Sequence, residues 1–99
     1  GSFSYVVSKH AQLGMMRATC QDLMGSGVHT ALVCPGFTDT EMLRTHLGND
    51  SGVIQSIGAM NSFGRLIDPE EIAELLFWAH ENPVINGAVL HANLGQKEA

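Results

Sequence analysis

The sequence predicts an α/β fold organised around a parallel sheet. Two short runs, 28–34 and 88–92, have the length of strands, and the first has the apolar content of a strand whose two faces are both covered. Each run follows a segment with helical character, the first at about 4–24 and the second starting at Asp68. Strands that alternate with helices are joined by right-handed crossovers and pair in parallel. The 99 residues allow at most one small domain, and two strands alone make an incomplete sheet.

The first helix is expected at about 4–24. Its apolar residues recur at helical spacing and are Leu13, Met16, Cys20 and Leu23. The segment 25–27 then ends the helix, because its two glycines tolerate the left-handed conformation that is common at helix C-termini. The strand at 28–34 follows and ends in Pro35-Gly36, a pair typical of turns.

The second helix has a clear start signal. Asp68 is expected to cap its first amides, Pro69 fits the first helical position, and Glu71 falls at the third. Its buried stripe is expected to comprise Ile72, Leu75, Leu76 and Ala79. Asn82-Pro83 ends the helix, and the strand at 88–92 follows.

The segment 37–63, between the first strand and the second helix, is the least regular part of the chain. Weak helical character is expected at 41–47 and at 53–60, with a loop at 48–52 between them. A long irregular segment after a strand is often a lid or a substrate-binding loop. Apolar residues within it favour an apolar-leaning pocket, and they are Leu43, Leu47, Val53, Ile57 and Met60.

Composition excludes several classes of function. The formal net charge of −5 gives no support to binding of nucleic acid or of an anionic membrane. No apolar run is long enough to span a bilayer. The five histidines and two cysteines show no metal-binding spacing, so no metal is expected. Cys20 and Cys34 lie in apolar runs, which predicts buried, reduced thiols and a cytoplasmic location.

Tyr5 and Lys9 are the residues best suited to take part in a reaction. Four residues apart at the start of a helix, they are expected on one face, about one turn from each other. A free tyrosine has a pKa of about 10, but a nearby ammonium group stabilises the phenolate. A Tyr-Lys pair of this kind can act as a general acid and base for a carbonyl or alcohol oxygen. On spacing alone, a surface pair without chemistry is the better explanation of the pattern.

The order of several segments adds to that spacing. In chain order they are Tyr5-Val6-Val7-Ser8-Lys9-His10-Ala11, Pro35-Gly36, Phe37-Thr38-Asp39-Thr40-Glu41-Met42, Gly64-Arg65, Asp68-Pro69-Glu70-Glu71-Ile72-Ala73 and Ile85-Asn86-Gly87-Ala88-Val89-Leu90-His91. The series resembles the C-terminal half of the short-chain dehydrogenase/reductase family. The resemblance covers residues 4–95 and implies part of a Rossmann-like, doubly wound parallel sheet.

The resemblance also implies roles for individual residues. Tyr5 matches the catalytic tyrosine, and Lys9 matches the lysine that activates it and binds the nicotinamide ribose of NAD or NADP. Pro35 and Gly36 match the turn beside the nicotinamide, and Thr38 and Thr40 fall where the family holds the carboxamide. The substrate implied is a small carbonyl or alcohol compound, bound by the 37–63 loop.

Simpler explanations exist for the same residues. Pro35-Gly36 is a common turn, and the hydroxyls of Thr38 and Thr40 suit local hydrogen bonds to the backbone. Asp39 suits a cap for a helix that begins at Glu41. Together with Tyr5 and Lys9, the cofactor role is the favoured explanation for Thr40 and, less strongly, for Thr38.

The family's glycine-rich phosphate loop and its catalytic serine are expected upstream of Gly1, and no Gly-x-Gly-x-x-Gly run occurs in the 99 residues. The chain is therefore expected to be a single incomplete domain over 1–99 that is inactive alone. The alternative is a truncated, non-catalytic module that self-associates. Under either interpretation a homo-oligomer is expected, formed through the 4–24 helix or an exposed sheet edge.

Overall fold

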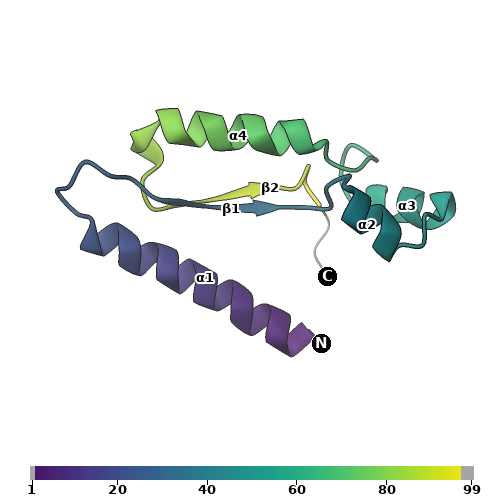
Figure 1. Cartoon of the computed structure of the whole chain (residues 1–99), viewed down its shortest axis with the longest axis horizontal. Helices are drawn as coiled ribbons and strands as arrows, with labels where there is room; N and C mark the ends of the chain where they lie inside the picture. Colours follow the sequence, from purple (N-terminus) through teal and green to yellow (C-terminus); the bar gives the residue numbers. More distant parts are fainter. Residues whose placement is uncertain (1, 97–99) are drawn as a thin grey trace. The chain divides into compact units, whose positions relative to one another are not determined.

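The computed structural model describes residues 2–96 (Figure 1). Its elements are α1 (Ser2–Asp22), β1 (Ala31–Pro35), α2 (Glu41–His46), α3 (Ser51–Gly58), α4 (Pro69–Glu81), the 3-10 turn η1 (Pro83–Ile85) and β2 (Ala88–Ala92). β1 and β2 pair with each other and run in the same direction. The predicted alternation of helices with parallel strands is therefore confirmed.

The described residues form two compact units. The first comprises 2–33 and Trp78–Leu90, and the second comprises Cys34–Phe77 and 91–96. Tyr5 and Lys9 belong to the first unit, whereas the turn after β1 belongs to the second. The single domain expected over 1–99 stays a prediction.

In the first unit, the predicted apolar stripe of α1 is present. Met16 is buried, with 8% of its surface exposed, and Leu13, Cys20 and Leu23 are half-buried. The helix ends at Asp22, and a turn follows in which Gly25 and Gly27 have φ values of 81° and 80°. Only glycine adopts such angles without strain, so the predicted role of this segment is confirmed.

The first strand begins at Ala31, three residues later than the 28–34 run predicts. The side chain of Asn86 explains the difference, because its Oδ1 accepts a hydrogen bond from the Thr30 amide at 2.9 Å. The same oxygen accepts from the Cys20 thiol at 3.4 Å. The Thr30 carbonyl accepts from the Gly87 amide at 2.7 Å, so Asn86 and Gly87 together hold the backbone just before β1. Cys20 and Cys34 are both free but only half-buried, so the predicted burial of the thiols is partial.

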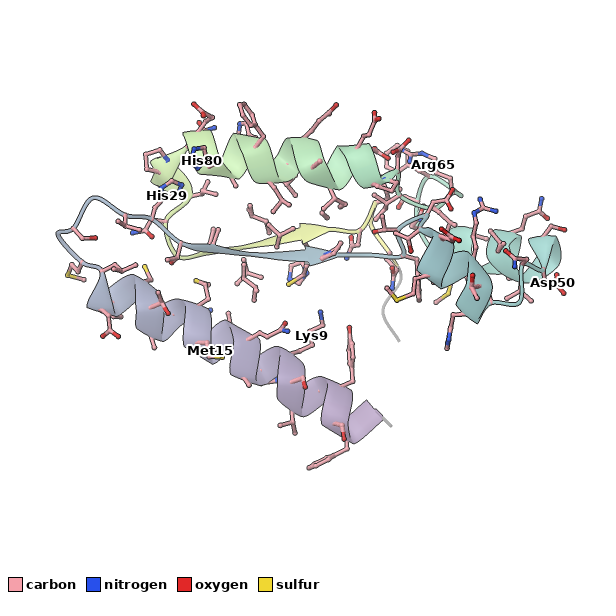
Figure 2. All side chains as sticks on the ribbon, viewed as in Figure 1. Lys9, Met15, His29, Asp50, Arg65 and His80 are labelled. Carbon is pink, nitrogen blue, oxygen red and sulfur yellow. The ribbon has the colours of Figure 1, made fainter. Side chains whose placement is uncertain are left out.

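The start of α4 matches its sequence signal. Asp68 Oδ1 accepts from the Glu70 amide at 2.9 Å, and Glu71 Oε1 accepts from the Asp68 amide at 3.0 Å. This reciprocal arrangement is a capping box. Arg65, labelled in Figure 2, adds two hydrogen bonds to the Glu71 carboxylate at 2.7 and 3.0 Å.

The predicted stripe of α4 is wrong at one position. Ala79 is buried and Ile72 and Leu75 are half-buried, but Leu76 is 52% exposed. Ile72, Leu75 and Ala79 share one face of the helix. Leu76 lies at the edge of that face, since it is one position after Leu75, and it is left at the surface.

The Arg65–Glu71 contact predicts how the start of α4 responds to acid. Hydrogen bonds from Arg65 and from the Asp68 amide lower the pKa of Glu71 from 4.5 to about 2. Because the folded-state pKa is depressed, the carboxylate contributes stability above pH 4.5 and loses that contribution as the pH falls towards 2. We expect the protection factors of the Asp68 and Glu70 amides, which are hydrogen-exchange rates corrected for the intrinsic rate at each pH, to fall across this range. In a Glu71→Gln variant the added acid sensitivity should disappear.

The segment 37–63 is more ordered than its sequence indicates. α2 covers Glu41–His46, close to the predicted 41–47. α3 covers Ser51–Gly58 and starts two residues before the predicted 53–60. Asp50, labelled in Figure 2, causes the earlier start, because its Oδ1 accepts from the Gly52 and Val53 amides at 2.9 and 3.2 Å. Across residues 2–96, no helix is long and apolar enough to cross a membrane.

Candidate functional site

Tyr5 and Lys9 lie one turn apart on α1. The Lys9 Nζ atom lies 5.4 Å from the centroid of the Tyr5 ring, so the predicted common face is confirmed. Tyr5 is 63% exposed, and Lys9, labelled in Figure 2, is half-buried. The first unit therefore presents an accessible phenol with a cation held over its ring. Their catalytic assignment stays a prediction.

In the second unit, Gly36 has a structural reason to be glycine. Its amide donates to the Ala92 carbonyl at 3.0 Å, which brings the turn after β1 against the end of β2. A Cβ atom on Gly36 would lie 2.9 Å from Asn93 Cβ and 3.0 Å from Asn93 Cα. Any side chain here would have to displace backbone. Close packing thus explains the glycine at position 36, and the predicted role of Pro35 and Gly36 beside a nicotinamide stays a prediction.

The turn continues as a short parallel bridge between Thr38 and Ile67. The Ile67 amide donates to the Phe37 carbonyl at 3.0 Å, and the Asp39 amide donates to the Ile67 carbonyl at 2.7 Å. Ile67 is buried, with 3% of its surface exposed. The residues on either side of Thr38 are therefore fixed by backbone hydrogen bonds.

Thr38 and Thr40 both make local hydrogen bonds. The Thr38 hydroxyl donates to the Gly36 carbonyl at 3.0 Å. The Thr40 hydroxyl accepts from the Leu43 amide at 3.1 Å and caps α2. A hydroxyl has one donor and two acceptor positions. Thr38 can therefore still accept a hydrogen bond from a ligand, and Thr40 can still donate one.

Asp39 does not cap α2, which corrects the interpretation of this residue from sequence. Thr40 takes the cap, and Asp39 instead binds Arg44 through two hydrogen bonds of 2.5 and 3.0 Å. The Arg44 guanidinium lowers the pKa of the Asp39 carboxyl, and Asp39 in turn raises the pKa of Arg44. The pair ties the 36–40 turn to α2 at two points.

A pocket of about 360 Å³ opens beside this turn. It is lined by Gly36, Phe37, Thr38, Thr40, Met42, Leu43 and His46. Of the residues from which an apolar pocket was predicted, Leu43 lines it, but Leu47, Val53, Ile57 and Met60 do not. Sequence interpretation missed Phe37, Met42 and His46. The four-residue spacing of Met42 and His46 was the available signal, because it places them on one face of a helix.

Within residues 2–96, no three His, Cys, Asp or Glu side chains are grouped so that they could hold a metal ion. From the 36–40 turn, the polar side chains that line the pocket are those of Thr38 and Thr40, and their neutral hydroxyls suit a ligand with hydrogen-bonding groups.

Comparisons with known proteins agree on one family. Residues 1–97 match a family model described as enoyl-(acyl carrier protein) reductase. Rat (Rattus norvegicus) 15-hydroxyprostaglandin dehydrogenase [NAD(+)] is 34% identical over 93 residues, which cover 87% of this chain and 35% of the relative. Acetoacetyl-CoA reductase of Rhizobium meliloti (strain 1021) is 32% identical over 98 residues, covering 97% and 40%.

A solved structure gives the same result. A mutant short-chain dehydrogenase/reductase of Serratia marcescens superposes with a TM-score of 0.82 at 27% identity, covering 96% of this chain and 38% of that one. The present chain spans about 29% to 40% of the length of the curated relatives it matches. The parallel strands and helices described above therefore correspond to part of a Rossmann-like fold. With a family model that matches nearly its whole length, the chain belongs to the short-chain dehydrogenase/reductase family.

Proposed function

We propose that the chain supplies the catalytic portion of a NAD(P)-dependent oxidoreductase that interconverts a small carbonyl compound and the corresponding alcohol. The observation that carries the proposal is the Tyr5–Lys9 pair, with the ammonium group 5.4 Å from the ring centroid and the phenol accessible. Membership of the family supports the same chemistry. Tyr5 would give a proton to the substrate oxygen during reduction and take one back during oxidation.

Residues of the second unit fit the nicotinamide end of such a cofactor. A carboxamide has one acceptor oxygen and one donor NH₂ group. Thr40 retains a free O–H that can donate to the oxygen, and Thr38 retains lone pairs that can accept from the NH₂ group. When bound, NAD(P) would donate or accept the hydride. Lys9 is proposed to bind the ribose hydroxyls, as the family resemblance implies.

The choice between NAD and NADP also belongs to the proposal. The rat relative carries NAD(+) in its name, which supports NAD for that protein. We propose NAD(P) without a preference for this chain, because the residues assigned here contact the nicotinamide end that both cofactors share.

A chimera tests the function directly. Residues 3–96 would replace the corresponding segment of the R. meliloti acetoacetyl-CoA reductase, which this chain matches over 98 residues. We expect the purified chimera to change the absorbance of NADH or NADPH in the presence of a carbonyl substrate. The 99-residue chain alone should give no turnover, because it contains no glycine-rich phosphate loop. A folded chimera without turnover of any carbonyl or alcohol compound would count against the proposal.

Self-association is a second candidate function, favoured by the exposed surface of α1. Several large apolar side chains of α1 are 48% to 81% exposed, namely Phe3, Val6, Val7 and Met15. Met24, just after the helix, is 75% exposed. Exposed apolar groups in such number favour burial against another protein surface. Sedimentation velocity of the 99-residue chain should therefore show dimers or larger species. A monomer that persists over a wide concentration range would contradict this candidate.

A further inference from the structure

We propose that the pocket beside the 36–40 turn selects substrates that carry a carboxylate on an apolar chain, and that His46 binds that carboxylate. The inference rests on the proposed oxidoreductase function, because it names the class of compound on which that function would act. It concerns a specificity-determining residue and not a group that takes part in proton or hydride transfer.

The pocket has two chemically different walls. The turn contributes Thr38 and Thr40, whose hydroxyls are proposed to hold the nicotinamide carboxamide. The other wall comes from α2 and contributes Met42, Leu43 and His46. Residues three and four positions apart share a face of a helix, so His46 is next to both apolar residues. A ligand against this wall meets an apolar surface that ends in one imidazole.

Phe37 extends the apolar part of the pocket. It is 36% exposed, while Met42 is 80% exposed, so both retain apolar surface that a ligand can cover. Covering such surface stabilises a complex in proportion to the area removed from water. An alkyl chain is therefore the kind of group that these walls favour, in a pocket of a size common for small molecules.

His46 is the only residue of the lining set that can carry a positive charge. The other cation of α2, Arg44, is engaged by both oxygens of Asp39 at 2.5 and 3.0 Å. The remaining charged residues close in sequence are Glu41, at the start of α2, and Asp50, whose Oδ1 caps α3. Among residues 2–96, no hydrogen bond or ion pair engages the His46 ring. A ring N–H of His46 is thus available to an anionic ligand.

Three compounds with the same carbon chain separate charge from shape, namely hexanoate, hexanamide and 1-hexanol. Each would be titrated into the ¹⁵N-labelled 99-residue chain, with the amide shifts of Met42, Leu43 and His46 as the readout. We expect hexanoate to bind more tightly than hexanamide, and 1-hexanol to bind most weakly. Equal affinity for hexanoate and hexanamide, or no shift at these three amides, would overturn the proposal.

Two variants then assign the effect to the imidazole. His46→Phe removes the donor but keeps an apolar ring, and we expect hexanoate to bind about tenfold more weakly, since one charge-assisted hydrogen bond is lost. His46→Gln keeps a neutral donor, and hexanoate should then bind no better than hexanamide. Binding of 1-hexanol should be unchanged in both. Unchanged hexanoate affinity in His46→Phe contradicts the assignment.

His80 provides the matched control. It is an exposed histidine in the last turn of α4, in the other unit, and it is labelled in Figure 2. His80→Phe and His80→Gln should leave hexanoate binding unchanged. The two proposals also fail separately. If the chimera turns over carbonyl compounds but hexanoate binds the His46 variants as tightly as the unmodified chain, only the assignment of His46 is wrong. If hexanoate binding depends on His46 but the chimera is inactive, the oxidoreductase proposal is wrong and the pocket assignment stands.

Discussion

Replacing Tyr5 with phenylalanine should lower turnover by the chimera by about 10²- to 10⁴-fold, the range expected when a general acid–base group is removed. The substitution deletes one oxygen and keeps the ring over which Lys9 Nζ lies at 5.4 Å. Because Tyr5 is 63% exposed, its hydroxyl contributes little to packing, and folding should be unaffected. The measurement is kcat with a saturating carbonyl substrate, accompanied by circular dichroism of both proteins.

A relocated phenol tests whether the position of the hydroxyl matters. Tyr5 is the only tyrosine in the chain, and Phe3 lies two residues before it on α1. Residues two positions apart on a helix point in different directions. The double variant Tyr5→Phe/Phe3→Tyr therefore keeps the composition and moves the hydroxyl off the face shared with Lys9. We expect it to be as inactive as Tyr5→Phe. Turnover that is insensitive to Tyr5→Phe would show that this residue is not the proton donor.

Features encoded by neighbouring residues could be predicted from the sequence. The capping box at Asp68 and the one-turn separation of Tyr5 and Lys9 are of this kind, because helix geometry alone fixes them. The start of β1 could not be predicted, since it depends on Asn86, which is 56 positions from Thr30. No local pattern shows that the Thr30 amide will bind a side chain this far along the chain.

Sequence-based prediction also failed where a polar side chain has several possible hydrogen-bond partners. Asp39 and Thr40 both suit a helix cap, and the structure assigns the cap to Thr40 because Arg44 engages Asp39. His46 was overlooked for a related reason. It belongs to no metal-like or catalytic spacing, and its significance comes only from the pocket that α2 and the 36–40 turn form together. The order of the motifs along the sequence was enough to identify the family. The residues that line the pocket could be identified only from the folded structure.

Ile67→Ala should have the largest effect on stability, about 2–5 kcal/mol, the cost of truncating a buried isoleucine. Ile67 is 3% exposed and is the most deeply buried apolar residue among those that form the core of the described chain. A domain of this size has a narrow stability margin. We therefore expect the second unit to be largely unfolded in the variant, measured by urea denaturation followed by far-UV circular dichroism.

The conservative variant Ile67→Val separates packing from backbone pairing. It removes one methylene, keeps β-branching and should cost only about 0.5–1.5 kcal/mol. The Asp39 amide, which donates to the Ile67 carbonyl at 2.7 Å, is the local probe, and its exchange should accelerate about tenfold for each 1.4 kcal/mol of stability lost. Because Ile67 pairs with Thr38, the same loss should release the turn that lines the pocket. Hexanoate binding should then weaken in Ile67→Ala although no lining residue has changed. If Ile67→Ala cost no more than Ile67→Val and left the Asp39 amide protected, Ile67 would not be what holds the turn in place.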